Sequence, residues 1–240
     1  MTDPLAALSA ALQEDPQAAL TLYSHLPPAL QPQAGEVALG LGRPGLALAW
    51  APDPLVRAAA ALRLGDAARA QAELAALPAG PRVQVLQARA AHQLARPDAP
   101  AATLAARAQA RAAGDSAALV AAAVLLAEQE YPQASSPYAP LRTLAEGLKV
   151  SELSGQSADP HLLAVLAYVQ ARLNPRKAQA TAHKALDRST PRSPARVLAL
   201  LALERTAEAQ AEAAAGELAP VWWAAFQRSP AAAQAVPNGT

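Results

Sequence analysis

The segment that decides the fold covers residues 53–70 and reads DPLVRAAAALRLGDAARA. Asp53 can accept a hydrogen bond from an unpaired amide of a first helical turn, and Pro54 suits that turn because it has no amide to satisfy. Gly65 can end the helix in the left-handed conformation, and Asp66 can then cap the next helix. A turn this short predicts an antiparallel helical hairpin.

The same start and stop signals recur along the chain. A capping residue followed by proline stands at Asp3-Pro4, Asp15-Pro16, Asp53-Pro54, Ser136-Pro137, Asp159-Pro160, Asn174-Pro175 and Ser193-Pro194, and a second glycine–aspartate turn at Gly114-Asp115. These signals predict helices at 4–14, 16–26, 32–41, 44–51, 54–64, 66–77, 81–95, 98–113, 115–130, 138–149, 160–173, 175–188, 194–204, 205–216 and 218–228.

The composition favours the same fold class. Alanine supplies 69 of the 240 residues and leucine 36, isoleucine is absent, and aromatic residues make up 3%. Alanine has the highest helix propensity, whereas the usual strand formers are scarce here. We therefore expect an all-α protein.

Charge and cysteine content narrow the function classes. The formal charge of +1 indicates neither a nucleic-acid nor an acidic partner for the molecule as a whole, and the absence of cysteine excludes disulfides, thiolate metal sites and a cysteine nucleophile. The N-terminus lacks the pattern of a secretion signal. The most apolar run, 117–127, is shorter than the roughly 20 residues of a membrane span. We expect a cytoplasmic protein with no membrane contact and no cofactor.

The hairpins repeat imperfectly, with starts at 4, 32, 54, 81, 115, 160 and 194. Spacings of this kind are typical of helical-hairpin repeats. Gly65-Asp66 followed by Ala70, and Ala178 with Ala185 and a closing Pro191, resemble the tetratricopeptide repeat family in degenerate form. The resemblance implies an α-solenoid of about seven antiparallel hairpins whose inner helices line a groove for a peptide or protein.

The domain organisation follows from the breaks in this pattern. We expect one helical repeat domain over 1–228, with the polar stretches 131–137 and 150–159 forming a possible hinge, 131–159, between two arrays. Residues 229–240 lack periodicity and are predicted to be a disordered tail.

The leading functional hypothesis is a non-enzymatic scaffold or adaptor that binds a protein or peptide on its concave face. The groove candidates are polar residues on the first helix of each hairpin, namely Arg57, Arg89, His92, Gln129, Gln170 and Arg172. The alternative is a nucleic-acid-binding protein that uses the basic region 172–205. Its candidate basic patch consists of Arg176, Lys177, Lys184 and Arg188, which could meet phosphates.

No pattern indicates catalysis or a metal site. The four histidines, at positions 25, 92, 161 and 183, have no metal-ligand spacing, and no Walker, G-x-S-x-G or G-x-G-x-x-G motif is present. Glu204, Glu208 and Glu212 form one helical stripe, which we expect to be a solvated face.

The densest aromatic cluster contains Trp222, Trp223 and Phe226. We expect a helix over 218–228 that caps the last hairpin, as repeat arrays require. Adjacent tryptophans point about 100° apart on a helix, so one of them could instead anchor a partner or a dimer.

Overall fold

The computed structural model describes residues 3–132, 134 and 136–227, and every secondary-structure element in that part of the chain is a helix. The elements are α1 (Pro4–Glu14), α2 (Pro16–Ser24), α3 (Gln31–Gly40), α4 (Pro44–Trp50), α5 (Pro54–Leu64), α6 (Ala67–Ala75), α7 (Pro81–Gln93), α8 (Ala99–Ala113), α9 (Ser116–Glu130), α10 (Tyr138–Leu153), α11 (Pro160–Ala171), α12 (Pro175–Arg188), α13 (Pro194–Ala202), α14 (Thr206–Ala215), the 3-10 helix η1 (Pro220–Trp222) and α15 (Ala224–Gln227). The all-α prediction is confirmed.

Side-chain caps begin many of these helices. The carboxylates of Asp3, Asp15 and Asp53 each accept the amide two residues later, at 2.9–3.0 Å. Gly65 and Gly114 end α5 and α8 with φ of 81° and 67°, in the left-handed region that glycine tolerates best. The local signals therefore place these helix ends where the sequence predicted them.

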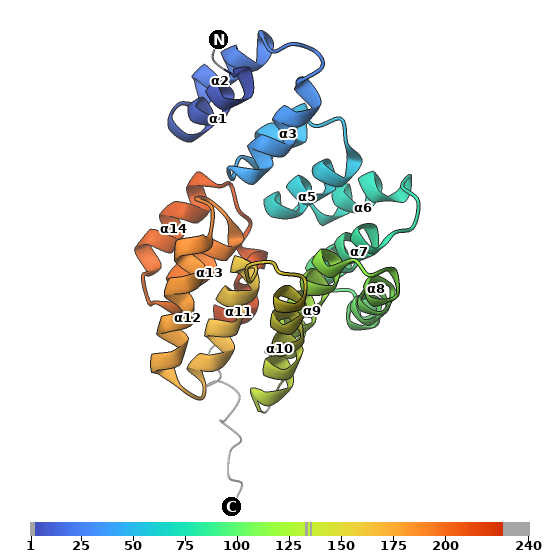
Figure 1. Cartoon of the computed structure of the whole chain (residues 1–240), viewed down its shortest axis with the longest axis vertical. Coiled ribbons are helices and arrows are strands. Elements are labelled where there is room, and N and C mark those ends of the chain that lie inside the picture. Colours follow the sequence, from blue (N-terminus) through green and yellow to red (C-terminus); the bar gives the residue numbers. More distant parts are fainter. Residues whose placement is uncertain (1–2, 133, 135, 228–240) are drawn as a thin grey trace, which may run out of the picture.

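Consecutive helices pack on one another in adjacent pairs, and the whole array is curved (Figure 1). The chain runs from α1–α4 through α7 and α8, then turns back through α11–α14, so that the end of α14 comes close to the end of α3. Arg43, just before α4, donates from Nη1 to the carbonyl of Ala215 at the end of α14, at 3.3 Å. The two ends of the array are thus in direct contact.

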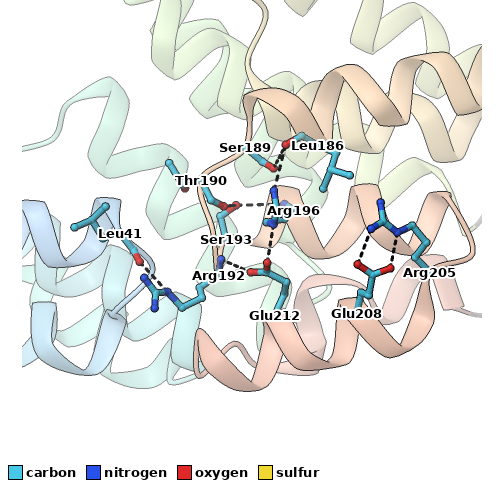
Figure 2. A network of polar contacts seen from close by, with 10 residues as sticks. All are labelled: Leu41, Leu186, Ser189, Thr190, Arg192, Ser193, Arg196, Arg205, Glu208 and Glu212. Carbon is cyan, nitrogen blue, oxygen red and sulfur yellow. Dashed lines mark hydrogen bonds and ion pairs between the residues drawn. The ribbon is translucent and has the colours of Figure 1, made fainter. Parts of the chain in front are cut away.

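The loop between α12 and α13 adds to this contact, as Figure 2 shows for Arg192 and Leu41. Arg192 donates from Nε to the carbonyl of Leu41 at 3.2 Å, and its amide donates to Glu212 Oε2 at 2.6 Å. Two segments approach this loop so closely that each needs a glycine where it meets Arg192. A Cβ on Gly42 would lie 2.5 Å from Arg192 Cβ, and one on Gly216 would lie 2.6 Å from the Arg192 carbonyl oxygen.

The largest buried cluster spans α9 to α14 and includes Leu162, Val165 and Leu198. A separate cluster holds α1–α4 together, and there the Tyr23 and Trp50 rings stack with centroids 4.3 Å apart. Many core positions are alanines, so the helices can approach closely.

Three expectations about local structure need correction or lie outside the structure. The helix expected over 218–228 is instead the short η1 and α15, because Ala219 is extended and its amide bonds outside the segment. Within the polar stretch 150–159, residues up to Leu153 belong to α10, which packs along α9. The predicted disordered tail, 229–240, lies outside the described residues.

The acidic stripe is also not a solvated face throughout. Glu204 precedes α14 and is exposed, and Glu208 pairs with Arg205. Glu212, however, is partly buried and accepts from Arg196 Nε at 2.7 Å as well as from the Arg192 amide (Figure 2). The closing loop therefore recruits one of the three carboxylates.

Two glycines of α3 give a test of the packing. A Cβ on Gly35 would lie 2.5 Å from Ala51 Cβ and 2.6 Å from its Cα, whereas one on Gly40 would meet nothing within 4 Å. We expect Gly35→Ala to lower the free energy of unfolding by about 1–3 kcal/mol through overpacking. Gly40→Ala should leave it unchanged or slightly raised. Urea denaturation of both variants checks this, and equal stability would contradict the close approach of α3 to Ala51.

Candidate ligand-binding cavity

The curved array encloses a cavity of about 630 Å³ that opens to solvent. Its walls come from α5, α7 and α9, from the segment 156–161 at the start of α11, and from the segment 188–195 between α12 and α13. Ser151 and Trp222 complete the lining. The cavity thus draws on elements that are far apart in the sequence.

Much of the wall is apolar. Val85, Leu86, Val120 and Val124 provide the larger side chains, and alanines of α5 and α9 lie between them. Because alanine stops at Cβ, this face leaves open space where bulkier residues would fill it.

The C-terminal segment closes one side of the cavity by binding the end of α5. Trp222 donates from Nε1 to the carbonyl of Leu62 at 3.0 Å, and the amide of Ala219 donates to the carbonyl of Arg63 at 2.9 Å. The last carbonyls of a helix have no partner within it, so they are natural acceptors. A Cβ on Gly65 would lie 2.6 Å from Ala219 Cβ, so the glycine that ends α5 also leaves room for this segment.

The aromatic cluster is divided between two places. Trp222 lines the cavity, where the Arg89 guanidinium lies 4.7 Å from its ring centroid and the His161 ring meets it edge-on at 5.8 Å. Trp223 and Phe226 instead belong to the largest buried cluster, together with Leu200.

A buried charge cluster lies beside the cavity. The side chain of Glu128 on α9 is only 3% exposed, and its two oxygens contact Arg89 of α7 and His161 Nε2 of α11, the latter at 2.7 Å. Desolvation would raise the pKa of Glu128, but Arg89 and His161 outweigh it and lower that pKa to about 2. Glu128 is therefore ionised and compensates the charge of Arg89.

Neither ring nitrogen of His161 is open to a ligand. Nε2 faces Glu128, and Nδ1 is buried without a hydrogen-bond partner in the part of the chain that the structure describes. This histidine joins α9 to α11 and is not placed to exchange a proton with a molecule in the cavity.

Two further arginines line the cavity without a carboxylate. Arg63 of α5 donates to the carbonyl of Leu39, and burial lowers its pKa to about 10. Arg188, at the end of α12, is exposed. Among the described residues, no carboxylate oxygen lies within 4.0 Å of either guanidinium.

The structure places one of the six predicted groove residues, Arg89, in the cavity. The others lie elsewhere: Arg57 pairs with Glu73, Gln129 donates to Thr103, Gln170 accepts from Thr181, Arg172 donates to the carbonyl of Ala134, and His92 is partly buried with a pKa lowered by desolvation and by Arg89. Four of these side chains thus have partners within the protein.

The predicted basic patch is also divided. Arg176, Lys177 and Lys184 are exposed on α12, while Arg188 lines the cavity. Sequence reasoning missed Arg63 and Asp159 as cavity residues, because a single arginine in a last helical turn and an N-cap aspartate carry no signal beyond the helix itself.

Comparisons with protein-family models, with curated proteins and with solved structures find no match to this chain. The resemblance to tetratricopeptide repeats therefore stays a prediction. Among the described residues, no three histidine, aspartate or glutamate side chains are grouped to hold a metal ion, and no helix is long and apolar enough to cross a membrane.

The buried charge cluster predicts a specific loss of stability in acid. The pKa of Glu128 is lowered by folding, so its contribution is present above about pH 4.5 and is lost as the pH falls toward 2. We expect wild type to lose on the order of 3 kcal/mol through this group over that range. Urea denaturation between pH 7 and pH 2 measures the change.

Glu128→Gln should be less stable than wild type at pH 7 by about 3–5 kcal/mol, because Arg89 is left buried without a counter-charge. Its stability should also depend less on pH. The matched control is Glu152→Gln, which removes an exposed carboxylate of α10. An acid profile of Glu128→Gln identical to that of wild type would contradict the buried pair.

The contact of Trp222 with α5 predicts a local effect. Trp222→Phe removes the indole N–H and should cost about 1 kcal/mol. It should also speed hydrogen exchange of the Ala219 amide, which depends on the same docking. Trp50→Phe, in the cluster of α1–α4, serves as the control and should leave that amide protected. Unchanged exchange in Trp222→Phe would show that the indole bond does not hold the segment.

Proposed function

We propose that the chain is a non-enzymatic protein-binding scaffold or adaptor that takes a peptide segment of its partner into the cavity. In this proposal the helices form a solenoid of about seven antiparallel hairpins that resembles degenerate tetratricopeptide repeats. The curvature of such an array gathers side chains from distant hairpins on its inner face.

The single observation that carries this proposal is the open cavity itself. It combines an apolar wall with a few polar groups, which is the usual make-up of a binding site. Leu86 and Trp222 provide surfaces for apolar side chains of a ligand, and the hydroxyls of Thr190 and Ser193 lie on the same lining.

The chemistry of the lining supports binding more than catalysis. The histidine of the cavity has both ring nitrogens occupied or buried, and the ionised Glu128 is held by Arg89 and His161. A general acid or base needs a free position within reach of its substrate, and neither residue offers one.

Peptide selection tests the proposal. A random peptide library displayed on phage is selected against the purified chain, and the selected peptides are titrated against two variants. Leu86→Arg places a long cation on the cavity wall and should weaken binding at least tenfold. The control is Leu104→Arg, which makes the same change at an exposed position of α8 and should leave the affinity unchanged.

Two results would reject the proposal. The first is that the selection yields no peptide whose binding is weakened by Leu86→Arg. The other is tight binding of labelled RNA or DNA that falls steeply with salt and is lost in Lys177→Gln and Lys184→Gln, because a phosphate-driven complex releases counterions. That second result would favour the basic face of α12 over the cavity.

A further inference from the structure

The cavity carries an excess of positive charge that the protein does not neutralise. Three arginines line it, and one of them, Arg89, is paired with Glu128. The remaining two, Arg63 and Arg188, have no carboxylate within 4.0 Å among the described residues.

The carboxylate of Asp159 also lines the cavity but is committed elsewhere. Its Oδ1 accepts the amides of His161 and Leu162 at 2.8 and 2.9 Å, as the N-cap of α11. Arg89 is balanced by Glu128, so the remaining charged groups of the lining are Arg63, Arg188 and Asp159. If only arginines and carboxylates are counted, the lining therefore has a net charge of one positive unit.

Arg63 is the more informative of the two cations. It lies in the last turn of α5 and is partly buried, and the loss of hydration there disfavours its charge and lowers its pKa. Its guanidinium has five N–H donors, and the hydrogen bond to the carbonyl of Leu39 uses only Nη1. A partly buried cation that lines a cavity and has unused donors is stabilised by an anion bound there.

We propose that Arg63 provides an oxyanion subsite that binds a carboxylate of the ligand, with Arg188 on the same lining adding to the positive charge of the cavity. A guanidinium binds a carboxylate through two parallel N–H···O bonds, which fixes the orientation of the group. The single excess charge favours a carboxylate over a dianionic phosphate. The apolar wall formed by Leu86, Val120 and Val124 takes the part of the ligand that bears the carboxylate.

This inference rests on the proposed binding function and narrows its ligand to an apolar body with a carboxylate. An acidic side chain of a peptide and a small organic acid present the same chemistry. The experiment therefore uses 4-phenylbutyrate as the simple probe, with its neutral amide as the matched control. Isothermal titration at pH 7.5 in 50 mM and 300 mM NaCl measures both.

We expect the acid to bind wild type at least tenfold more tightly than the amide, with the difference shrinking at high salt. Arg188→Gln should reduce that preference severalfold. Arg63→Gln should abolish it, and Arg63→Lys, which keeps the charge but not the two-pronged geometry, should retain part of it. Arg176→Gln makes the same charge change on the exposed start of α12 and should behave as wild type.

Arg63→Gln also removes the bond to Leu39, so a folding defect in that variant alone decides nothing, and the result rests on Arg63→Lys and Arg188→Gln. Equal affinity for acid and amide, no binding of the acid up to 10 mM, or an unchanged preference in Arg188→Gln and Arg63→Lys would overturn the subsite.

Competition separates the subsite from the proposed function. Displacement of a selected peptide by 4-phenylbutyrate places both in one cavity, and weaker binding of that peptide after its glutamates are changed to glutamine assigns the carboxylate to the peptide. Peptides that bind through Leu86 but ignore the acid and all three arginine variants would overturn the oxyanion subsite and leave the scaffold function standing.

Discussion

The docking of the C-terminal segment on the end of α5 is the contact on which the cavity depends. Ala219 donates its amide to the carbonyl of Arg63, and Trp222 donates its indole N–H to the carbonyl of Leu62, which also accepts from the Gly65 amide and from Gln93. Arg192 repeats the same solution at the end of α3, where it donates to the carbonyl of Leu41. Carbonyls at helix ends are thus the points at which one end of the array contacts the other.

The buried charges beside the cavity contribute specificity of packing more than net stability. Removing Arg89 and Glu128 from water is costly, and their mutual attraction only offsets that cost when the geometry is good. Arg89 of α7, Glu128 of α9 and His161 of α11 form one cluster, so their arrangement fixes how these three helices pack. The cluster also orients Arg89 over Trp222, so the wall of the cavity and its polar support form one unit.

The sequence predicted the helix ends that depend on nearby residues, and it missed the contacts between segments that are distant along the chain. Capping residues such as Asp53, and a glycine such as Gly65, act within one turn of a helix, so the bounds of α5 were found correctly. The path of residues 218–227 was not predicted, because Ala219 is extended and its amide bonds to the distant carbonyl of Arg63 where the sequence favoured a helix. Five of the six groove candidates lie outside the cavity for a similar reason. Which face of a helix lines the cavity depends on the curvature of the whole array, and helical periodicity alone does not contain it.

The separation of residues 62 and 222 along the chain has a consequence for biogenesis. The bond between them cannot form until Trp222 has left the ribosome, and by then the first 62 residues have already emerged. Hairpins near the N-terminus, built from contacts between neighbours, fold much earlier, because nearby segments meet faster than distant ones. The nascent protein therefore passes through an open array, and the cavity is completed only after the hairpins that supply its other walls.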